Sequence, residues 1–84
     1  MDIKQPIRQY VLQNFLFTDD ESALVDGDSF LSGGIIDSTG VLEIMYFIED
    51  TFGIKVEDEE MLPENLDSVD NLVAFVSRKM AVAA

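Results

Sequence analysis

Apolar residues recur at intervals of three and four along three separate segments of this chain, the spacing that gathers side chains on one face of an α-helix. The segments are residues 3–17, residues 37–52 and the stretch that follows Ser68. A chain of 84 residues with 48% hydrophobic content can bury one small core. The pattern therefore predicts an all-α fold, a single domain over residues 1–84 with three main helices and one short helix.

Residues that suit helix ends mark the boundaries of these segments. Asp2 can cap the first helix, Asp37 or Ser38 the second, and Ser68 the last. Their side chains can accept hydrogen bonds from the unpaired N–H groups of a first helical turn. Gly53 suits the left-handed residue that ends the second helix.

The two connections differ in length and character. Residues 18–36 lack periodicity and mix acids, serines and three glycines, which predicts a long loop of the kind that is more often functional than idle. Five apolar residues are expected to attach this loop to the core: Ala23, Leu24, Val25, Phe30 and Leu31. After Gly53, an extended piece and a short helical turn over residues 59–62, capped by Asp58, are expected.

Helical projection divides the second helix into two sides. The side expected to be buried holds Val41, Ile44, Met45, Ile48 and Phe52. The side expected to be exposed holds Thr39, Glu43, Tyr46, Phe47 and Asp50, with Leu42 and Glu49 at the boundary. Aromatic residues and acids thus share the exposed side.

Composition excludes several classes of chemistry. The chain contains no cysteine and no histidine, so disulfides, thiolate catalysis, catalytic triads and imidazole-ligated metals are impossible. Seventeen acidic residues against five basic ones give a net charge of −12, and eleven of the acids lie within residues 37–70. Such a chain repels nucleic acid and anionic membranes and favours partners rich in lysine and arginine. We therefore expect no enzymatic activity, no nucleic-acid partner and no membrane insertion.

Neither a metal site nor a targeting segment is expected. Asp26-Gly27-Asp28 begins like a calcium loop, but Phe30 occupies the next ligand position. The acids of residues 57–60 are expected to be solvated, with weak divalent-cation binding as the alternative. The sequence has no apolar stretch long enough for a membrane span and no secretory signal, which indicates a cytoplasmic protein.

Ser38 is the residue on which a function can be built. A glycine-containing loop leads to it, and it stands where backbone N–H groups and the helix dipole favour an anion. A phosphate ester on Ser38 would suit that position. A serine that merely caps the helix would explain the same residue.

Residues 31–79 resemble the acyl carrier and peptidyl carrier protein family. The resemblance lies in a Gly-x-x-Asp-Ser signature, here Gly34 to Ser38, and in an acidic helix that ends at Phe52-Gly53-Ile54. It implies a four-helix acyl-carrier-like bundle with a long loop between the first two helices. It also implies that a phosphopantetheinyl transferase uses coenzyme A to attach 4'-phosphopantetheine to Ser38, beside Asp37. An acyl or aminoacyl group then forms a thioester with the thiol of this arm, which supplies the sulfur that the chain lacks.

The resemblance also implies a docking face on the second helix. We expect it to comprise Thr39, Leu42, Glu43, Tyr46 and Asp50. Charges there would steer a basic partner and the apolar side chains would complete the contact, whereas a merely solvated face would not explain the aromatic residues. Thr39 departs from the leucine or similar aliphatic residue that is most frequent in the family, which bears on the choice of partner.

The expected function is therefore that of a monomeric carrier in fatty-acid, polyketide, nonribosomal-peptide or related biosynthesis. Its partners would be the transferase and the loading and processing enzymes with basic docking patches. A specialised carrier for an amino acid or an unusual acyl unit fits as well as a fatty-acid carrier. An unmodified acidic interaction module is the alternative. A fatty cargo could shelter among Val41, Met45, Ile48, Phe30, Ile54 and Leu62, although each is also a candidate core residue.

Overall fold

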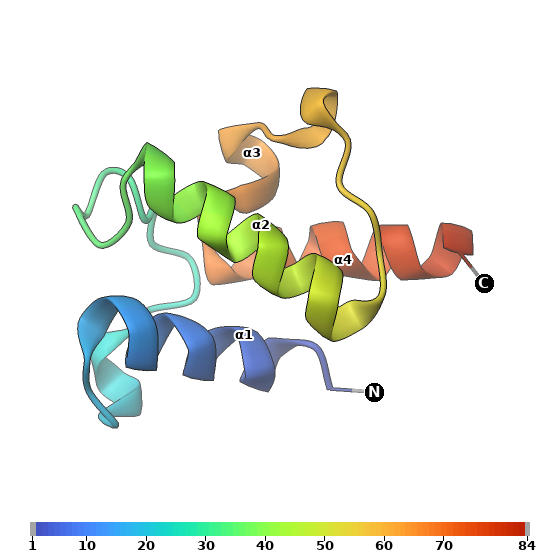
Figure 1. Cartoon of the computed structure of the whole chain (residues 1–84). Helices are drawn as coiled ribbons and strands as arrows, with labels where there is room; N and C mark the ends of the chain where they lie inside the picture. The colour runs from blue at the N-terminus through green and yellow to red at the C-terminus, as the bar shows by residue number, and fades with distance from the viewer. Residues whose placement is uncertain (1, 84) are drawn as a thin grey trace.

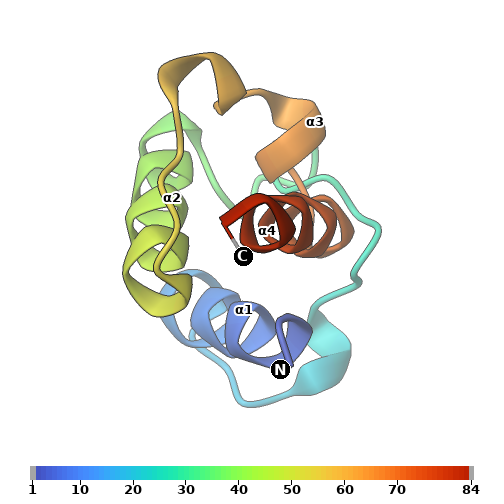
Figure 2. The same ribbon diagram turned by 90° about the vertical axis from the view of Figure 1, so that its right-hand side faces the viewer.

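The computed structural model describes residues 2–83, with the backbone alone at residues 38, 82 and 83. Its four α-helices are α1 (Lys4–Val11), α2 (Ser38–Phe52), α3 (Pro63–Leu66) and α4 (Val69–Ala83), and residues 2–83 contain no strand. Helix α4 contacts each of the other three helices, which lie around it (Figures 1 and 2). The predicted all-α bundle of three main helices and one short helix is confirmed.

One continuous apolar core joins the helices and the loops. Phe30, from the long loop, and Phe75, from α4, are its largest fully buried side chains. The other buried apolar residues are Ile7, Val11, Leu12, Leu24, Ile36, Ile44, Met45, Ile48, Phe52, Val56, Leu66, Val69, Leu72 and Val76. The long loop is thus part of the core rather than an appendage to it.

The first helix begins as predicted but ends differently. The Asp2 carboxylate accepts a hydrogen bond from the Gln5 N–H at 3.3 Å, which confirms its capping role. After Val11 the helix widens into a π-helical turn over Leu12–Leu16, and Phe17 adopts a left-handed conformation with φ of 53°. The predicted regular helix through residue 17 is therefore wrong at its end. This left-handed residue costs about 1–2 kcal/mol and turns the chain into the loop.

Helix α2 follows its predicted boundaries, and its faces follow the projection with one exception. Four of the five residues on the predicted core side are buried, and Val41 is half-buried. Phe47, predicted to be exposed, is instead half-buried and stacks on Tyr10 of α1, with ring centroids 4.1 Å apart. The helical projection placed Phe47 wrongly because it assumes a single covered face. The core and α1 both cover α2, so its buried face is wider than the projection predicts. Glu49, at the predicted boundary, is half-buried and accepts a hydrogen bond from the Val56 N–H at 2.9 Å.

The long loop is attached to the core by fewer residues than predicted. Leu24 and Phe30 are buried, whereas Ala23, Val25 and Leu31 are exposed. Leu24 has extended backbone angles, so the side chain of the next residue points the opposite way. Leu24 and Val25 therefore cannot both enter the core.

A buried arginine that the sequence analysis did not identify anchors the start of this loop. Arg8 of α1 donates hydrogen bonds to the backbone carbonyls of Glu21, at 2.6 Å, and Leu24, at 2.9 Å. Its guanidinium also pairs with the carboxylates of Glu21 and Asp26, and Lys4 pairs with Asp26 at 2.8 Å. Asp26 thus serves an ion-pair network and not a calcium loop.

The second connection is helical in a different place from the prediction. Glu57, not Asp58, caps a 3₁₀ turn over Asp58–Glu60, and Pro63 begins α3 instead of ending a helical turn. Proline is well suited to a first helical position because it has no N–H to satisfy there. The Ser68 hydroxyl accepts from the Asn71 N–H at 3.1 Å, which confirms the predicted cap of α4.

None of the described helices has the length and apolar character that crossing a membrane requires. Within residues 2–83, no group of three acidic side chains is arranged to hold a metal ion.

Candidate functional site

Ser38 is the first residue of α2, and its neighbours fix that start. The Asp37 carboxylate accepts a hydrogen bond from the Gly40 N–H at 2.8 Å, which confirms Asp37 as the cap. The Asp37 carbonyl accepts from the Val41 N–H at 3.1 Å, which is the first bond of the helix. Ser38 therefore stands at the positive end of a 15-residue helix dipole.

The loop before Ser38 is held by a residue that is distant in the sequence. The Asp67 carboxylate, just before α4, accepts from the Leu31 N–H at 2.9 Å and from the Ser29 hydroxyl. The Phe30 N–H donates to the Asp67 carbonyl at 2.6 Å, and Gly34 takes a left-handed conformation with φ of 70°. The role of Asp67 could not be predicted from the sequence, because its partners lie more than thirty positions away and periodicity records only near neighbours.

Gly40 has a packing role that sequence reasoning also missed. A Cβ atom at this buried position would lie 2.5 Å from Cγ2 of Ile36 and 2.9 Å from Cε1 of Phe15. The first turn of α2 therefore packs directly against the loop and against the end of the first helix. This contact fixes the first turn of α2 against both neighbours.

The surroundings of Ser38 fit a large, anionic group attached to it. Asp37 and Thr39, on either side, are both exposed, so an attached group would have room. The N-terminus of α2 favours a phosphate. The carboxylate of the adjacent Asp37 already accepts the hydrogen bond that caps the helix. The chain has no cysteine, so a thiol would have to come with such a group.

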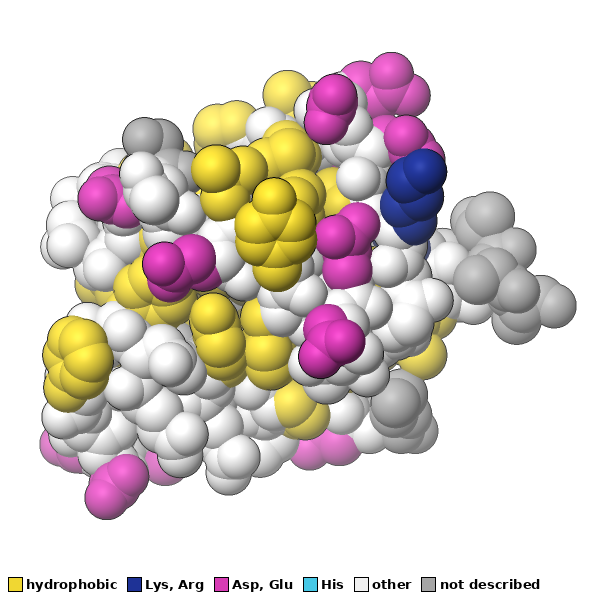
Figure 3. Space-filling view, in the orientation of Figure 1, with side chains coloured by type: hydrophobic (Ala, Val, Ile, Leu, Met, Phe, Trp, Pro, Cys, Tyr) yellow, Lys and Arg dark blue, Asp and Glu magenta, His cyan; other side chains and the backbone are white. Residues whose placement is uncertain are grey.

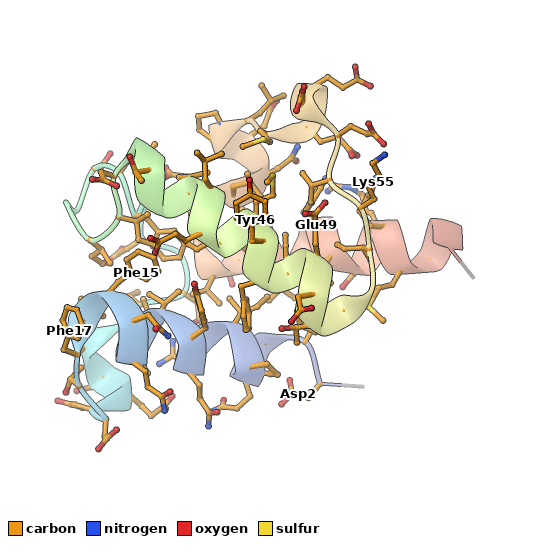
Figure 4. The ribbon with its side chains drawn as sticks, in the orientation of Figure 1. Asp2, Phe15, Phe17, Tyr46, Glu49 and Lys55 are labelled. Carbon is orange, nitrogen blue, oxygen red and sulfur yellow. The ribbon has the colours of Figure 1, made fainter. Side chains whose placement is uncertain are left out.

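The five residues of the predicted docking face are all exposed along α2: Thr39, Leu42, Glu43, Tyr46 and Asp50. Tyr46 is 64% exposed and Leu42 42% exposed. In Figure 3, hydrophobic side chains gather over α2 and the region between α2 and α3, with acidic side chains among and around them. Figure 4 shows Tyr46 on the side of α2 that faces the viewer. The structure therefore brings these five residues onto one solvent-facing surface.

Two hollows flank the first turns of α2. One, of about 230 Å³, is mainly apolar and is lined by Leu31, Val41, Met61, Leu62, Pro63, Leu66 and Asp67. The other, of about 390 Å³, lies toward the end of the first helix and mixes aromatic with polar residues: Asn14, Phe15, Phe17, Gly34, Ile35, Asp37, Thr39, Gly40 and Glu43. Of the residues expected to shelter a fatty cargo, Val41 and Leu62 line the apolar hollow. Phe30 and Ile48 are fully buried in the core.

Glu43 influences its surroundings electrostatically. Burial raises the pKa of the Tyr10 phenol, and the negative charge of Glu43 raises it further. Glu43 thus belongs both to the predicted docking face and to the lining of the mixed hollow.

Comparison with known proteins agrees with this geometry. No family model matches the chain. The D-alanyl carrier proteins of Streptococcus pyogenes serotype M1 and of serotype M5 (strain Manfredo) are each 35% identical to it over 72 residues. These residues cover 83% of this chain and 90% of the relative. With this similarity, the all-helical bundle and a serine at the start of α2, the chain belongs to the acyl carrier and peptidyl carrier protein family of phosphopantetheine-binding carriers.

Proposed function

We propose that this protein carries an aminoacyl group as a thioester on a 4'-phosphopantetheine arm attached to Ser38. One observation carries the proposal: Ser38 opens a long helix directly after a capping aspartate, with exposed residues on both sides. The proposal treats residues 1–84 as one carrier domain that has no catalytic residues of its own. It acts by presenting its cargo to enzymes.

The chain's own residues hold the attachment point in place and leave the chemistry to the arm. When attached, the arm supplies the thiol that forms the thioester. Asp37 fixes the first turn of α2 through the Gly40 N–H, and the helix dipole stabilises the negative phosphodiester. The anchored loop, held by Asp67, keeps Ser38 at a fixed place relative to the docking face.

The relatives and Thr39 support an aminoacyl cargo. The similar proteins are named D-alanyl carrier proteins, which makes an alanyl group the first candidate. Thr39, in place of the usual aliphatic residue, suits a small polar cargo more than a fatty chain. A fatty acyl or polyketide intermediate is the second candidate, and the apolar hollow beside α3 is where it would shelter.

The partners are enzymes that present basic surfaces. The docking face carries Glu43 and Asp50 with Tyr46 between them, so a lysine- or arginine-rich patch with an apolar centre complements it. We assign to this class the transferase that adds the arm and the enzymes that load and use the cargo. The carrier would act as a monomer in the cytoplasm.

The test is an intact-mass measurement after incubation with coenzyme A and a broad-specificity phosphopantetheinyl transferase. The wild-type protein should gain the mass of one arm, and Ser38→Ala should gain none. Ser32→Ala is the matched control, because Ser32 is an exposed serine of the neighbouring loop, and it should be modified like the wild type. An unmodified wild-type protein would leave an acidic interaction module as the better description.

The cargo has its own test. The modified protein should accept an alanyl group from ATP, alanine and a matching adenylating enzyme, with a further mass gain that hydroxylamine removes. Modification at Ser38 together with loading by a fatty acid only, and by no amino acid, would refute the aminoacyl part of the proposal.

A further inference from the structure

The mixed hollow beside Ser38 is lined by an exposed aromatic side chain that core packing does not explain. Phe17 lines it, yet Phe17 is 81% exposed and holds a left-handed backbone conformation that phenylalanine disfavours. Figure 4 shows Phe17 at the outer edge of the turn after α1, and Phe15 between that turn and the start of α2. An exposed aromatic ring held in a strained conformation contributes little to the core, which suggests a functional contact.

The lining of this hollow matches a ligand with apolar and amide groups. Phe15, Phe17 and Ile35 supply apolar surface, whereas Asn14 and Thr39 supply polar groups. The Asn14 amide nitrogen donates to the Tyr10 carbonyl at 3.0 Å, which leaves its oxygen as an acceptor. The hollow on the other side of the helix offers mainly aliphatic side chains. The two sides of α2 therefore favour different ligands.

Charge and position narrow the choice of ligand further. The hollow is bordered by Asp37 and Thr39, the two residues that flank Ser38, so the backbone that would bear the arm passes along its rim. The carboxylates of Asp37 and Glu43 line it and attract a cation. A tether raises the local concentration of its end to the millimolar range, so weak contacts suffice to populate a bound state.

We infer that this hollow is the resting site of the aminoacyl-loaded arm. The dimethyl carbons of the arm lie against Phe17, its amides bond Asn14 and Thr39, and the ammonium group of the aminoacyl cargo faces Glu43. This inference rests on the proposed function, because it requires the arm on Ser38. It adds a binding site that distinguishes an amine-bearing cargo from a fatty one.

The test compares backbone NMR spectra of four forms of the labelled protein. These are the unmodified form, the form with the bare arm, and forms whose arm carries an alanyl or a hexanoyl group through a stable amide. The transferase attaches each arm from the corresponding coenzyme A analogue, and intact mass confirms attachment. The alanyl form should shift signals of residues 14–17 and 34–43 beyond the shifts of the bare arm. Signals of Met61 and Leu66, in the apolar hollow, should stay in place.

Two substitutions in the hollow and one outside it separate binding in the hollow from general surface effects. Phe17→Ala should reduce the additional shifts of the alanyl form to those of the bare arm. Val25→Ala removes another exposed apolar side chain, one outside the hollow, and should leave the shifts unchanged. Glu43→Gln should make the alanyl and hexanoyl forms alike at residues 14–17.

The outcomes distinguish the two proposals. A protein that never gains the arm overturns the proposed function and this inference with it. An attached alanyl arm that shifts only residues 37–39, or that shifts the apolar hollow instead, overturns this inference alone. If the additional shifts of the alanyl form persist in Phe17→Ala, the inference is also overturned. The exposed Phe17 would then be better explained as a contact for a partner enzyme.

Discussion

Gly40 is the residue at which packing and helix propensity make opposite predictions. Replacing this glycine by alanine would gain about 1 kcal/mol of helix propensity. The new Cβ would, however, lie 2.5 Å from Ile36 and 2.9 Å from Phe15, and Ile36 is β-branched and buried. Overpacking of this kind costs roughly 1–3 kcal/mol. We expect Gly40→Ala to lower the free energy of unfolding, measured by urea denaturation.

Gly27 provides the matched control for this prediction. A Cβ there would make only one ordinary contact, at 3.6 Å from an Asp70 carboxylate oxygen, and its backbone is not left-handed. Gly27→Ala should therefore leave stability unchanged or raise it slightly. A Gly40→Ala protein as stable as Gly27→Ala would contradict the close approach at the head of α2.

Asp26 makes stability depend on pH in a defined direction. Hydrogen bonds from Lys4 and then from Arg8 hold the pKa of Asp26 below its usual range, although partial burial opposes them. Because the pKa is lower in the folded protein than in the unfolded chain, the stabilising contribution is complete above about pH 4 to 5. It disappears as the pH falls through the folded-state pKa. Asp26→Asn should therefore be less stable than the wild type at pH 7.

The quantity to measure is the difference in the free energy of unfolding between the wild type and Asp26→Asn. It should stay constant from pH 7 to about pH 5 and vanish on further acidification, because both then carry an uncharged side chain. Asp19→Asn, an exposed change in the same loop, removes the same charge without the ion pairs and is the control. A difference that persists in strong acid would show that Asp26 acts through shape and not through its charge.

At the scale of the elements, the sequence predicted α2 far better than its neighbours. The start of α2 at Ser38, its cap at Asp37 and its end at Gly53 depend on contacts within four residues, which local patterns record. The π-helical turn after Val11 and the left-handed Phe17 have no such pattern.

The loops were predicted less well because their partners are distant in sequence. Arg8 joins residues 13 to 18 positions away, and Asp67 holds a loop more than thirty positions before it. A prediction from periodicity also assumes that only one face of a helix is covered. Phe47 was misplaced because α1 covers a second part of α2. The candidate site was therefore predictable where it is local, at residues 37 and 38, and the anchors that position it were not.

The face of α2 gives a prediction about partner recognition. Glu43→Lys reverses one charge of the proposed docking face at an exposed position, so the fold should persist. Attachment of the arm to Ser38 should slow several-fold at low salt, because a rim charge acts mainly on the rate of association. The measurement is the initial rate of transfer from coenzyme A, with circular dichroism as the check on folding.

Glu59→Lys is the control for this experiment, because it makes the same charge change at an exposed residue outside α2. It should slow transfer less than Glu43→Lys does. Equal slowing by the two variants would mean that the transferase responds to the net charge of −12 and not to a particular face.

At the scale of the whole molecule, the excess of negative charge acts on every part of the fold at once. The longest dimension of the protein is 34 Å, and the Debye length is about 30 Å at 0.01 M salt and about 10 Å at 0.1 M. At the lower concentration nearly all the acids repel one another, whereas at the higher one only neighbours do. The folded state, which is more compact than the unfolded chain, therefore gains stability as salt is added.

This gain should exceed the loss from screening of favourable ion pairs. The pairs between Lys4 and Asp26 and between Lys79 and Glu60 are 2.8 Å and 2.7 Å long, well within the Debye length at either concentration. We expect Tm to rise by a few degrees between 0.01 M and 0.1 M NaCl, since about 1 kcal/mol moves Tm by roughly 4–8 °C in a domain of this size. Asp58→Asn combined with Glu59→Gln should raise Tm at low salt and flatten its rise. A Tm that does not change with salt in the wild type would mean that the short ion pairs, and not the long-range repulsion, set the electrostatic part of its stability.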